Sequence, residues 1–134
     1  MPLYRSPVYS RGVTRKPDES DPQSVLPLPV AVFHILVALA DEERHGYAIM
    51  QDVAARTGGK LRLSAGTLYG AIKRMLEDGL IEETAERPDA EYHDERRRYY
   101  RVTAFGREAA MAEAERLSQL VSQAQAIGWL PKQV

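Results

Sequence analysis

The sequence predicts a mainly α fold of the α+β class, in which four helices accompany one β-hairpin. Apolar residues recur at helical spacing in the segments 28–39, 45–56, 64–79 and 104–127. Two short alternating runs, 80–85 and 98–103, follow the third segment and are separated by a polar, proline-containing loop over 86–97. A chain of 134 residues suffices for one compact domain with appendages, since domains commonly contain about 100–200 residues.

The composition excludes several classes of protein. Hydrophobic residues make up 44% and charged residues 28% of the chain, as in soluble globular proteins. The chain has no cysteine, so no disulfide, thiolate metal site or thiol nucleophile can form. The longest apolar run, 30–39, is about half of the roughly 20 residues that a membrane-spanning helix needs. We therefore expect a cytoplasmic protein without a membrane segment, metal or cofactor.

Residues 1–27 predict a flexible N-terminal arm. Prolines and basic residues are mixed there without a sustained apolar period. Two roles remain open for this arm: an uninvolved tail, or a basic segment that touches phosphates.

The next two helices are predicted from their apolar residues and their ends. Pro29 suits the first turn of the first helix. His34 is interpreted as a core or boundary histidine, because no partner His, Asp or Glu stands at metal-ligand spacing. The second helix, 45–56, ends at Thr57 and two glycines. Residues 60–63 alternate charged and apolar side chains over too short a distance for more than a minor edge strand.

The third helix has two chemically different faces. Ser64 can cap it by accepting a hydrogen bond from a backbone N–H group, and Gly79 can end it in the left-handed conformation. The face expected to be buried carries Leu68, Ile72, Met75 and Leu76. The face expected to be exposed carries Thr67, Tyr69, Gly70, Lys73 and Arg74.

The two alternating runs predict a hairpin, or wing, directly after this helix. In the second run Tyr100 and Val102 fall on one face of the strand, and Tyr99 and Arg101 on the other. Helices followed by such a hairpin give the winged helix-turn-helix arrangement, which we expect over residues 28–103.

The exposed face of the third helix has the residue types that contact DNA. Hydroxyl, phenol and cationic groups can bond phosphates and base edges. Gly70 costs about 1 kcal/mol relative to alanine inside a helix, so it is either tolerated or marks a close approach of DNA. The alternative for the whole face is an ordinary solvated surface. The predicted contacts on this helix are Ser64, Thr67, Tyr69, Lys73 and Arg74.

Three consecutive arginines lie where the loop of the wing leads into its second strand. Arg96, Arg97 and Arg98 adjoin the same helix and would meet the neighbouring phosphates of a duplex. The alternative is a solvated turn in which they pair with Asp94 and Glu95.

The last helix is predicted over 104–128, with Thr103 as its cap and a short tail over 129–134. A small core cannot cover its whole apolar stripe, so we expect it to pair with its copy in a second subunit. The alternative is that it folds back on its own subunit. Trp129 and Leu130 either close this interface or line a small apolar pocket. The predicted dimerisation residues are Leu117, Leu120, Val121, Ala124 and Ile127.

Together, these segments resemble the PadR family of bacterial transcriptional regulators. The resemblance covers residues 30 to about 127, and its motifs are His45-Gly46-Tyr47, Thr57-Gly58-Gly59, and the segments 63–69, 75–81, 97–100 and 103–107. It implies a winged-helix domain that binds double-stranded DNA, a C-terminal helix that makes a homodimer, and repression through an inverted-repeat operator. By position, Ser64, Thr67, Tyr69 and Lys73 match the recognition helix of the family. Some members release DNA when a small apolar or aromatic molecule binds near the dimer interface, which implies a candidate effector.

The chain departs from the family pattern at two places. Gly70 replaces the proline that often follows the Thr-Leu-Tyr motif. The wing is acidic before its arginines, so we expect few phosphate contacts at its tip and exclude Arg87. The acidic residues are Glu86, Asp89, Glu91, Asp94 and Glu95.

Two other functions compete with DNA binding. An enzyme is not expected, because Arg62 stands where a nucleophile elbow around Ser64 needs glycine, and the chain has no glycine-rich phosphate loop. The remaining alternative is a winged helix that binds another protein through Tyr69 and the wing.

Overall fold

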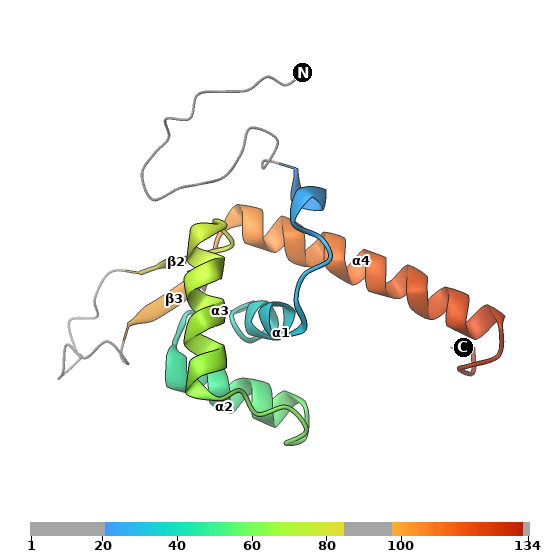
Figure 1. Ribbon diagram of the computed structural model, residues 1–134, viewed down its shortest axis with the longest axis horizontal. Helices are drawn as coiled ribbons and strands as arrows, with labels where there is room; N and C mark the ends of the chain where they lie inside the picture. Colours follow the sequence, from blue (N-terminus) through green and yellow to red (C-terminus); the bar gives the residue numbers. More distant parts are fainter. Residues whose placement is uncertain (1–20, 85–97, 133–134) are drawn as a thin grey trace.

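The computed structural model describes residues 21–84 and 98–132, and it confirms the α+β class and the winged helix-turn-helix arrangement (Figure 1). The elements are η2 (Pro22–Val25), α1 (Val30–Ala38), β1 (Arg44–His45), α2 (Gly46–Arg56), α3 (Ala65–Glu77), β2 (Ile81–Glu83), β3 (Tyr99–Val102) and α4 (Ala104–Ala126). The three strands form one antiparallel sheet in the order β1-β3-β2. Helices α1, α2 and α3 gather beside the sheet, and the C-terminal half of α4 extends away from them.

The core lies where α1 meets the other three α-helices. Because α1 packs against α2, α3 and α4, nearly every position along it is apolar. Ile35 is fully buried, as are Ile49 of α2 and Met75 of α3. Burial of one such side chain contributes about 1.5–3 kcal/mol. The packing therefore depends on α1 as its central element.

The wing is held by the register of its strands. Ile81 lies opposite Val102, and Glu82 lies opposite Arg101. Tyr100 is buried while Arg101 is exposed, as the alternation predicts. Strand β1 joins the other side of β3, with Arg44 opposite Tyr100. The sequence did not reveal β1, because two residues are too few to show a period.

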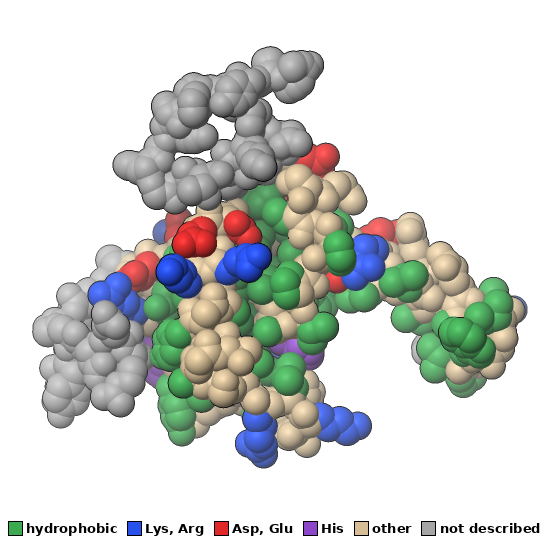
Figure 2. Space-filling model, viewed as in Figure 1, with side chains coloured by type: hydrophobic (Ala, Val, Ile, Leu, Met, Phe, Trp, Pro, Cys, Tyr) green, Lys and Arg blue, Asp and Glu red, His purple; other side chains and the backbone are tan. Residues whose placement is uncertain are grey.

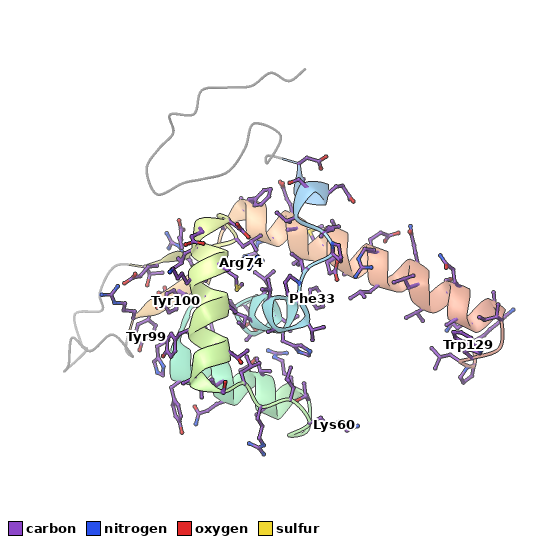
Figure 3. The ribbon with its side chains drawn as sticks, viewed as in Figure 1. Phe33, Lys60, Arg74, Tyr99, Tyr100 and Trp129 are labelled. Carbon is purple, nitrogen blue, oxygen red and sulfur yellow. The ribbon has the colours of Figure 1, made fainter. Side chains whose placement is uncertain are left out.

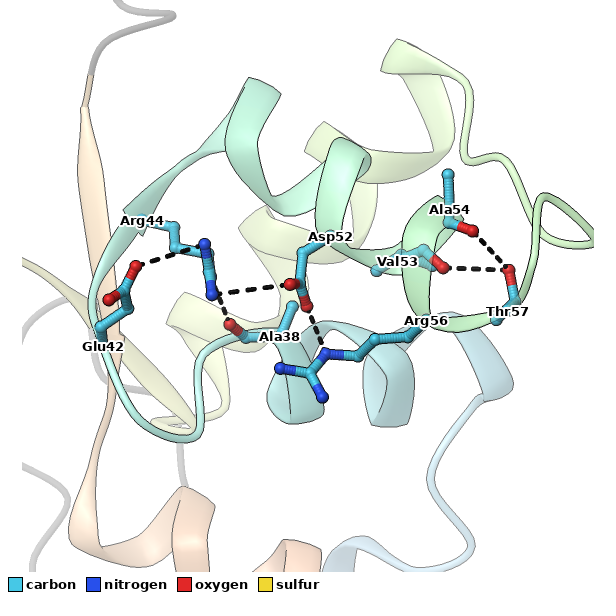
Figure 4. A network of polar contacts seen from close by, with 8 residues as sticks. All are labelled: Ala38, Glu42, Arg44, Asp52, Val53, Ala54, Arg56 and Thr57. Atoms are coloured by element: carbon cyan, nitrogen blue, oxygen red, sulfur yellow. Dashed lines mark hydrogen bonds and ion pairs between the residues drawn. The ribbon is translucent and has the colours of Figure 1, made fainter.

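Arg44 ties the end of α1 to α2 (Figure 4). Its Nε donates a hydrogen bond of 2.7 Å to the carbonyl oxygen of Ala38. Its guanidinium nitrogens lie 3.3 Å from the carboxylate of Glu42 and 3.5 Å from that of Asp52. Asp52 also accepts a hydrogen bond of 2.6 Å from Arg56. Since Arg44 belongs to β1, this network joins the sheet to both helices.

The ends of α3 and α4 match the predicted signals. The Ser64 hydroxyl accepts from the N–H of Thr67, and the Thr103 hydroxyl accepts from the N–H of Gly106. Gly79, with φ of 77°, follows α3 in the left-handed conformation. Leu76 differs from the prediction: it lies at the border of the buried face and is exposed.

The segment just before α1 differs from the predicted flexible arm. Residues 1–20 of that arm lie outside the described residues, but η2 packs against α4. The backbone N–H of Leu28 lies 3.4 Å from Oε1 of Glu113, which is only 2% exposed. Arg116 donates two further hydrogen bonds to this carboxylate, at 2.9 and 2.8 Å. Glu113 therefore links the segment before α1 to α4. No local sequence pattern predicts this interaction.

Replacement of Glu113 with alanine should lower the free energy of unfolding by about 1–3 kcal/mol, because it leaves the buried N–H of Leu28 without an acceptor and removes the carboxylate that Arg116 bonds. The hydrogen bond from Arg116, and secondarily that from Leu28, holds the pKa of Glu113 below its ordinary value against the opposing effect of burial. A carboxyl group whose pKa is lower in the folded chain than in the unfolded chain stabilises the fold at any pH above the unfolded-state pKa. This stabilisation is lost as the pH falls through the folded-state pKa. Urea denaturation measures the free energy of unfolding of both proteins. The wild-type protein should exceed the Glu113→Ala variant at about pH 7, and the difference should be smaller at about pH 3.

The matched control is Glu115→Ala, two residues along the same helix at an exposed position. It should change the free energy of unfolding by less than about 0.5 kcal/mol. Equal urea midpoints for the two variants at neutral pH would contradict the assigned role of Glu113.

Candidate nucleic-acid interface

Helix α3 turns one face to the core and the other to solvent. Thr67, Lys73 and Arg74 are exposed, as predicted, while the buried side chains come from the opposite face. Figure 3 shows Arg74 near the C-terminal end of the helix, on the side away from the wing strands. Because α3 also packs against β2, the hairpin lies beside the helix that carries this polar face.

The first turn of α3 is organised by two hydroxyl groups. Oγ of Ser64 accepts from the N–H of Thr67 at 3.1 Å and lies 3.1 Å from Oγ1 of Thr67. If Ser64 donates in this second contact, the Thr67 hydroxyl acts as acceptor and keeps its own proton to donate outward. Ser64 thus acts first as a cap, and Thr67 is the hydroxyl with capacity for an outside acceptor.

Tyr69 differs from the prediction of an exposed side chain. It is half-buried, and its phenol packs against Gly46 at the start of α2, where an added Cβ would overlap the ring. Position 69 follows the buried Leu68, so it lies at the border of the apolar face. The glycine within the His45-Gly46-Tyr47 motif is the sequence signal that could have indicated this contact.

Gly70 has no structural requirement for glycine in the fold. An added Cβ there would meet no atom within 4 Å, and the same holds at Gly66, one turn earlier. Both positions are exposed. Packing within the described chain therefore does not explain Gly70, and the two explanations given by the sequence remain.

The wing arginine that the structure describes is paired within the hairpin. Arg98 lies 3.3 Å from Glu83, and Arg101 lies 2.7 Å from Glu82 on the neighbouring strand. The sequence proposed phosphates or Asp94 and Glu95 as partners and missed these cross-strand carboxylates. Arg96, Arg97 and the five acidic residues of the loop lie outside the described residues.

Three exposed side chains near α3 were not among the predicted contacts: Tyr47, Lys60 and Arg62. The two cations belong to the stretch 60–63, which the sequence interpreted as a minor edge strand. The structure has no strand there. The alternation of charged and apolar residues was the signal that could have identified them.

The second half of α4 carries the predicted dimerisation residues on an open surface. Leu120 is 47% and Ile127 62% exposed, Val121 is exposed, and Leu117 and Ala124 are half-buried. This half of the helix projects from the domain, so it does not fold back on its own subunit (Figure 1). Gly128 ends the helix with φ of 83°, and the N–H of Trp129 bonds to the Ala124 carbonyl at 2.9 Å.

Residues 21–84 and 98–132 contain neither a membrane-spanning helix nor a metal-binding cluster. No helix there has the length and apolar character needed to cross a bilayer. No group of three His, Asp or Glu side chains in those ranges could hold a metal ion.

The comparison with protein families decides the assignment. Residues 35–112, which include the last turn of α1, the helix-turn-helix, the wing and the first part of α4, match the PadR-like family of transcriptional regulators. The chain belongs to this family. The assignment confirms the resemblance noted in the sequence, and with it the expectation of a regulator rather than an enzyme.

Two curated proteins show the likeness in sequence. The transcriptional regulator Rv3488 of Mycobacterium tuberculosis is 37% identical over 87 residues, which are 65% of this chain and 75% of that protein. An uncharacterised protein of Lysinibacillus sphaericus is 31% identical over 77 residues, 54% of this chain. The matched part spans 64% of that protein's length.

Solved structures share the fold of this PadR-like chain. A transcriptional regulator from Clostridium thermocellum has a TM-score of 0.59 at 24% identity, covering 75% of this chain and 92% of the other. Bacillus subtilis PadR in complex with operator DNA has a TM-score of 0.50 at 18% identity, covering 75% and 63%.

Replacement of Gly70 with alanine should raise the free energy of unfolding by about 0.5–1 kcal/mol, because alanine restricts the unfolded chain and meets open space in the folded one. Thermal denaturation followed by circular dichroism measures the change. Gly106→Ala should instead lower the free energy of unfolding, since its Cβ would overlap the Leu80 carbonyl oxygen. A lower midpoint for the Gly70 variant would show that an intramolecular contact requires the glycine.

Proposed function

We propose that this PadR-like regulator is a cytoplasmic, sequence-specific DNA-binding repressor that binds a palindromic operator as a homodimer. The observation that carries the proposal is the two-faced burial of α3. Its apolar face is held in the core, and Thr67, Lys73 and Arg74 face solvent on a helix that packs against strand β2 of the wing. An α-helix fits the major groove, which is about 12 Å wide.

The cations of this face are available to phosphates. In the described part of the chain, neither Lys73 nor Arg74 has an acidic side chain within ion-pair distance. Each phosphate that such a cation neutralises releases condensed counterions and makes binding salt-sensitive. The Bacillus subtilis relative, solved with operator DNA, supports the same use of the fold. A winged helix that binds only a protein would have no such salt dependence on duplex DNA.

The homodimer is supported by the open surface of α4. The apolar residues at 117, 120, 121, 124 and 127 follow the spacing by which two helices pair. Isolated exposure of so many large side chains is unfavourable, and pairing with a second copy would bury them. A two-fold dimer reads two half-sites about one helical turn, or about 10 base pairs, apart.

We propose that the effector, a small apolar or aromatic molecule, binds at the end of this helix. Trp129 and Leu130 are exposed there, and the turn at Gly128 brings them back beside α4. They would offer an aromatic ring and an aliphatic side chain to such a molecule.

Lys73→Ala should weaken binding to duplex fragments selected from the host genome by the purified wild-type protein. Each phosphate that is no longer neutralised flattens the slope of log affinity against log salt by about 0.9, hence by about 1.8 for a dimer bound through both subunits. Fluorescence anisotropy over a salt series measures the slope. Lys132→Ala, an exposed lysine beyond α4, is the control and should leave the slope unchanged. Failure of the wild-type protein to retain any duplex would refute the proposed function.

The double change Leu120→Glu with Val121→Glu should convert the dimer to monomers, because four carboxylates would face one another across the paired helices. Sedimentation velocity gives the oligomeric state. Met111→Glu is the matched control: Met111 is 66% exposed on the same helix but lies away from the stripe. A wild-type protein that sediments as a monomer at all concentrations contradicts the dimer.

A further inference from the structure

The turn between α2 and α3 is a firmly built segment. The Thr57 hydroxyl donates to the carbonyl oxygen of Val53 at 2.9 Å and accepts from the N–H of Leu61 at 3.0 Å. Figure 4 shows its contacts with the last turn of α2. Gly58 and Gly59 both have positive φ, and the N–H of Gly59 bonds to the Ala54 carbonyl at 2.7 Å. The chain after Gly59 therefore leaves α2 in one defined direction.

The side chains of this turn alternate between core and solvent. Leu63 is buried and Leu61 half-buried, and both belong to the core or pack against it. Lys60, just before Leu61, and Arg62, between the two leucines, are exposed. The leucines thus anchor the backbone and place both cations on the outer side, immediately before the cap of α3.

Lys60 and Arg62 lack the carboxylate partners that other described arginines have. Arg56 pairs with Asp52, and Arg98 pairs with Glu83. Lys60 and Arg62 have no acidic partner within ion-pair distance in the described part of the chain. In Figure 2 the basic side chains at the lower end of the molecule have no acidic side chain beside them. Lys60, labelled in Figure 3, lies at that end.

The cations lie at the opposite end of α3 from Lys73. Eight residues separate Ala65 from Lys73, which is about 12 Å at 1.5 Å per residue. The major groove is also about 12 Å wide, with a phosphate backbone on each side. Lys60 and Arg62 precede this stretch of helix and Lys73 ends it, so cations flank a length of α3 that is comparable to the width of the groove.

We propose that Lys60 and Arg62 bind backbone phosphates of duplex DNA on one side of the groove that α3 enters, opposite Lys73 and Arg74. The inference rests on the proposed DNA-binding function and adds two phosphate-binding residues to it. A protein partner fits less well, because the exposed residues from 58 to 67 include no large apolar side chain of the kind that dominates protein interfaces. Contacts to phosphate carry no sequence information, so these residues contribute affinity rather than specificity.

The test is the double variant Lys60→Ala with Arg62→Ala, measured by anisotropy on the selected duplex and on a scrambled duplex over a salt series. Removal of these two cations from both subunits of a dimer should flatten the salt slope by about 3.6, twice the change for Lys73→Ala. At about 0.1 M salt the affinity should fall by at least on the order of 10-fold, by the same factor on both duplexes. Both side chains are exposed, so the thermal midpoint should stay unchanged.

Two matched variants separate charge from structure. Lys60→Arg with Arg62→Lys keeps both charges and should keep the wild-type slope. Arg98→Ala with Arg101→Ala removes two arginines that are already paired and should flatten the slope by much less.

The outcomes distinguish this inference from the proposed function. A wild-type protein that binds the selected duplex, together with an unchanged slope for the Lys60 and Arg62 double alanine variant, overturns the inference and leaves DNA binding intact. Loss of affinity in the charge-preserving variant as large as in the alanine variant also overturns it. A wild-type protein that binds no duplex overturns both.

Discussion

The burial of the apolar face of α3 is the constraint on which the rest of the surface depends. Leu68, Ile72 and Met75 enter the core that α1 organises, so the helix cannot rotate about its axis. This fixes which side chains meet solvent, because residues on one helix face are set by a period of 3.6. The outward set of hydroxyls, glycines and cations follows directly from the inward set of apolar residues.

The net charge of −1 conceals how the charges are arranged. Most described arginines near the helix-turn-helix are paired with carboxylates: Arg44 and Arg56 with Asp52, and Arg101 with Glu82. Exposed pairs of this kind contribute little to stability, about 0–1 kcal/mol, but they remove positive charge from the surface. The positive charge that remains is therefore local: it is clearest before α3, at Lys60 and Arg62, whereas Glu77 and Asp78 follow Lys73 and Arg74 at the other end.

The parts of the fold that could be predicted are those with a local signal. The caps Ser64 and Thr103 and the left-handed Gly79 stand at fixed offsets from apolar periods, so α3 and α4 were predicted within a few residues. Strand β1 and the Glu113 contact depend on residues that are far apart in the sequence, and a periodic pattern of apolar residues does not predict such contacts. Tyr69 shows the same limit at the site: its ring is half-buried because position 46 is glycine, more than twenty residues away.

Thr103 links the helix proposed to bind DNA to the helix proposed to dimerise. Its hydroxyl donates to the carbonyl oxygen of Gly79 at 2.6 Å, just after α3, and accepts from the N–H of Gly106 in the first turn of α4. Gly106 packs so closely on Leu80 that no larger residue fits without a shift. The junction of α3, β2 and α4 is thus a single hydrogen-bonded and close-packed corner. If two copies pair through α4, this corner determines the separation of their α3 helices, and the operator spacing becomes a property of the rigid subunit.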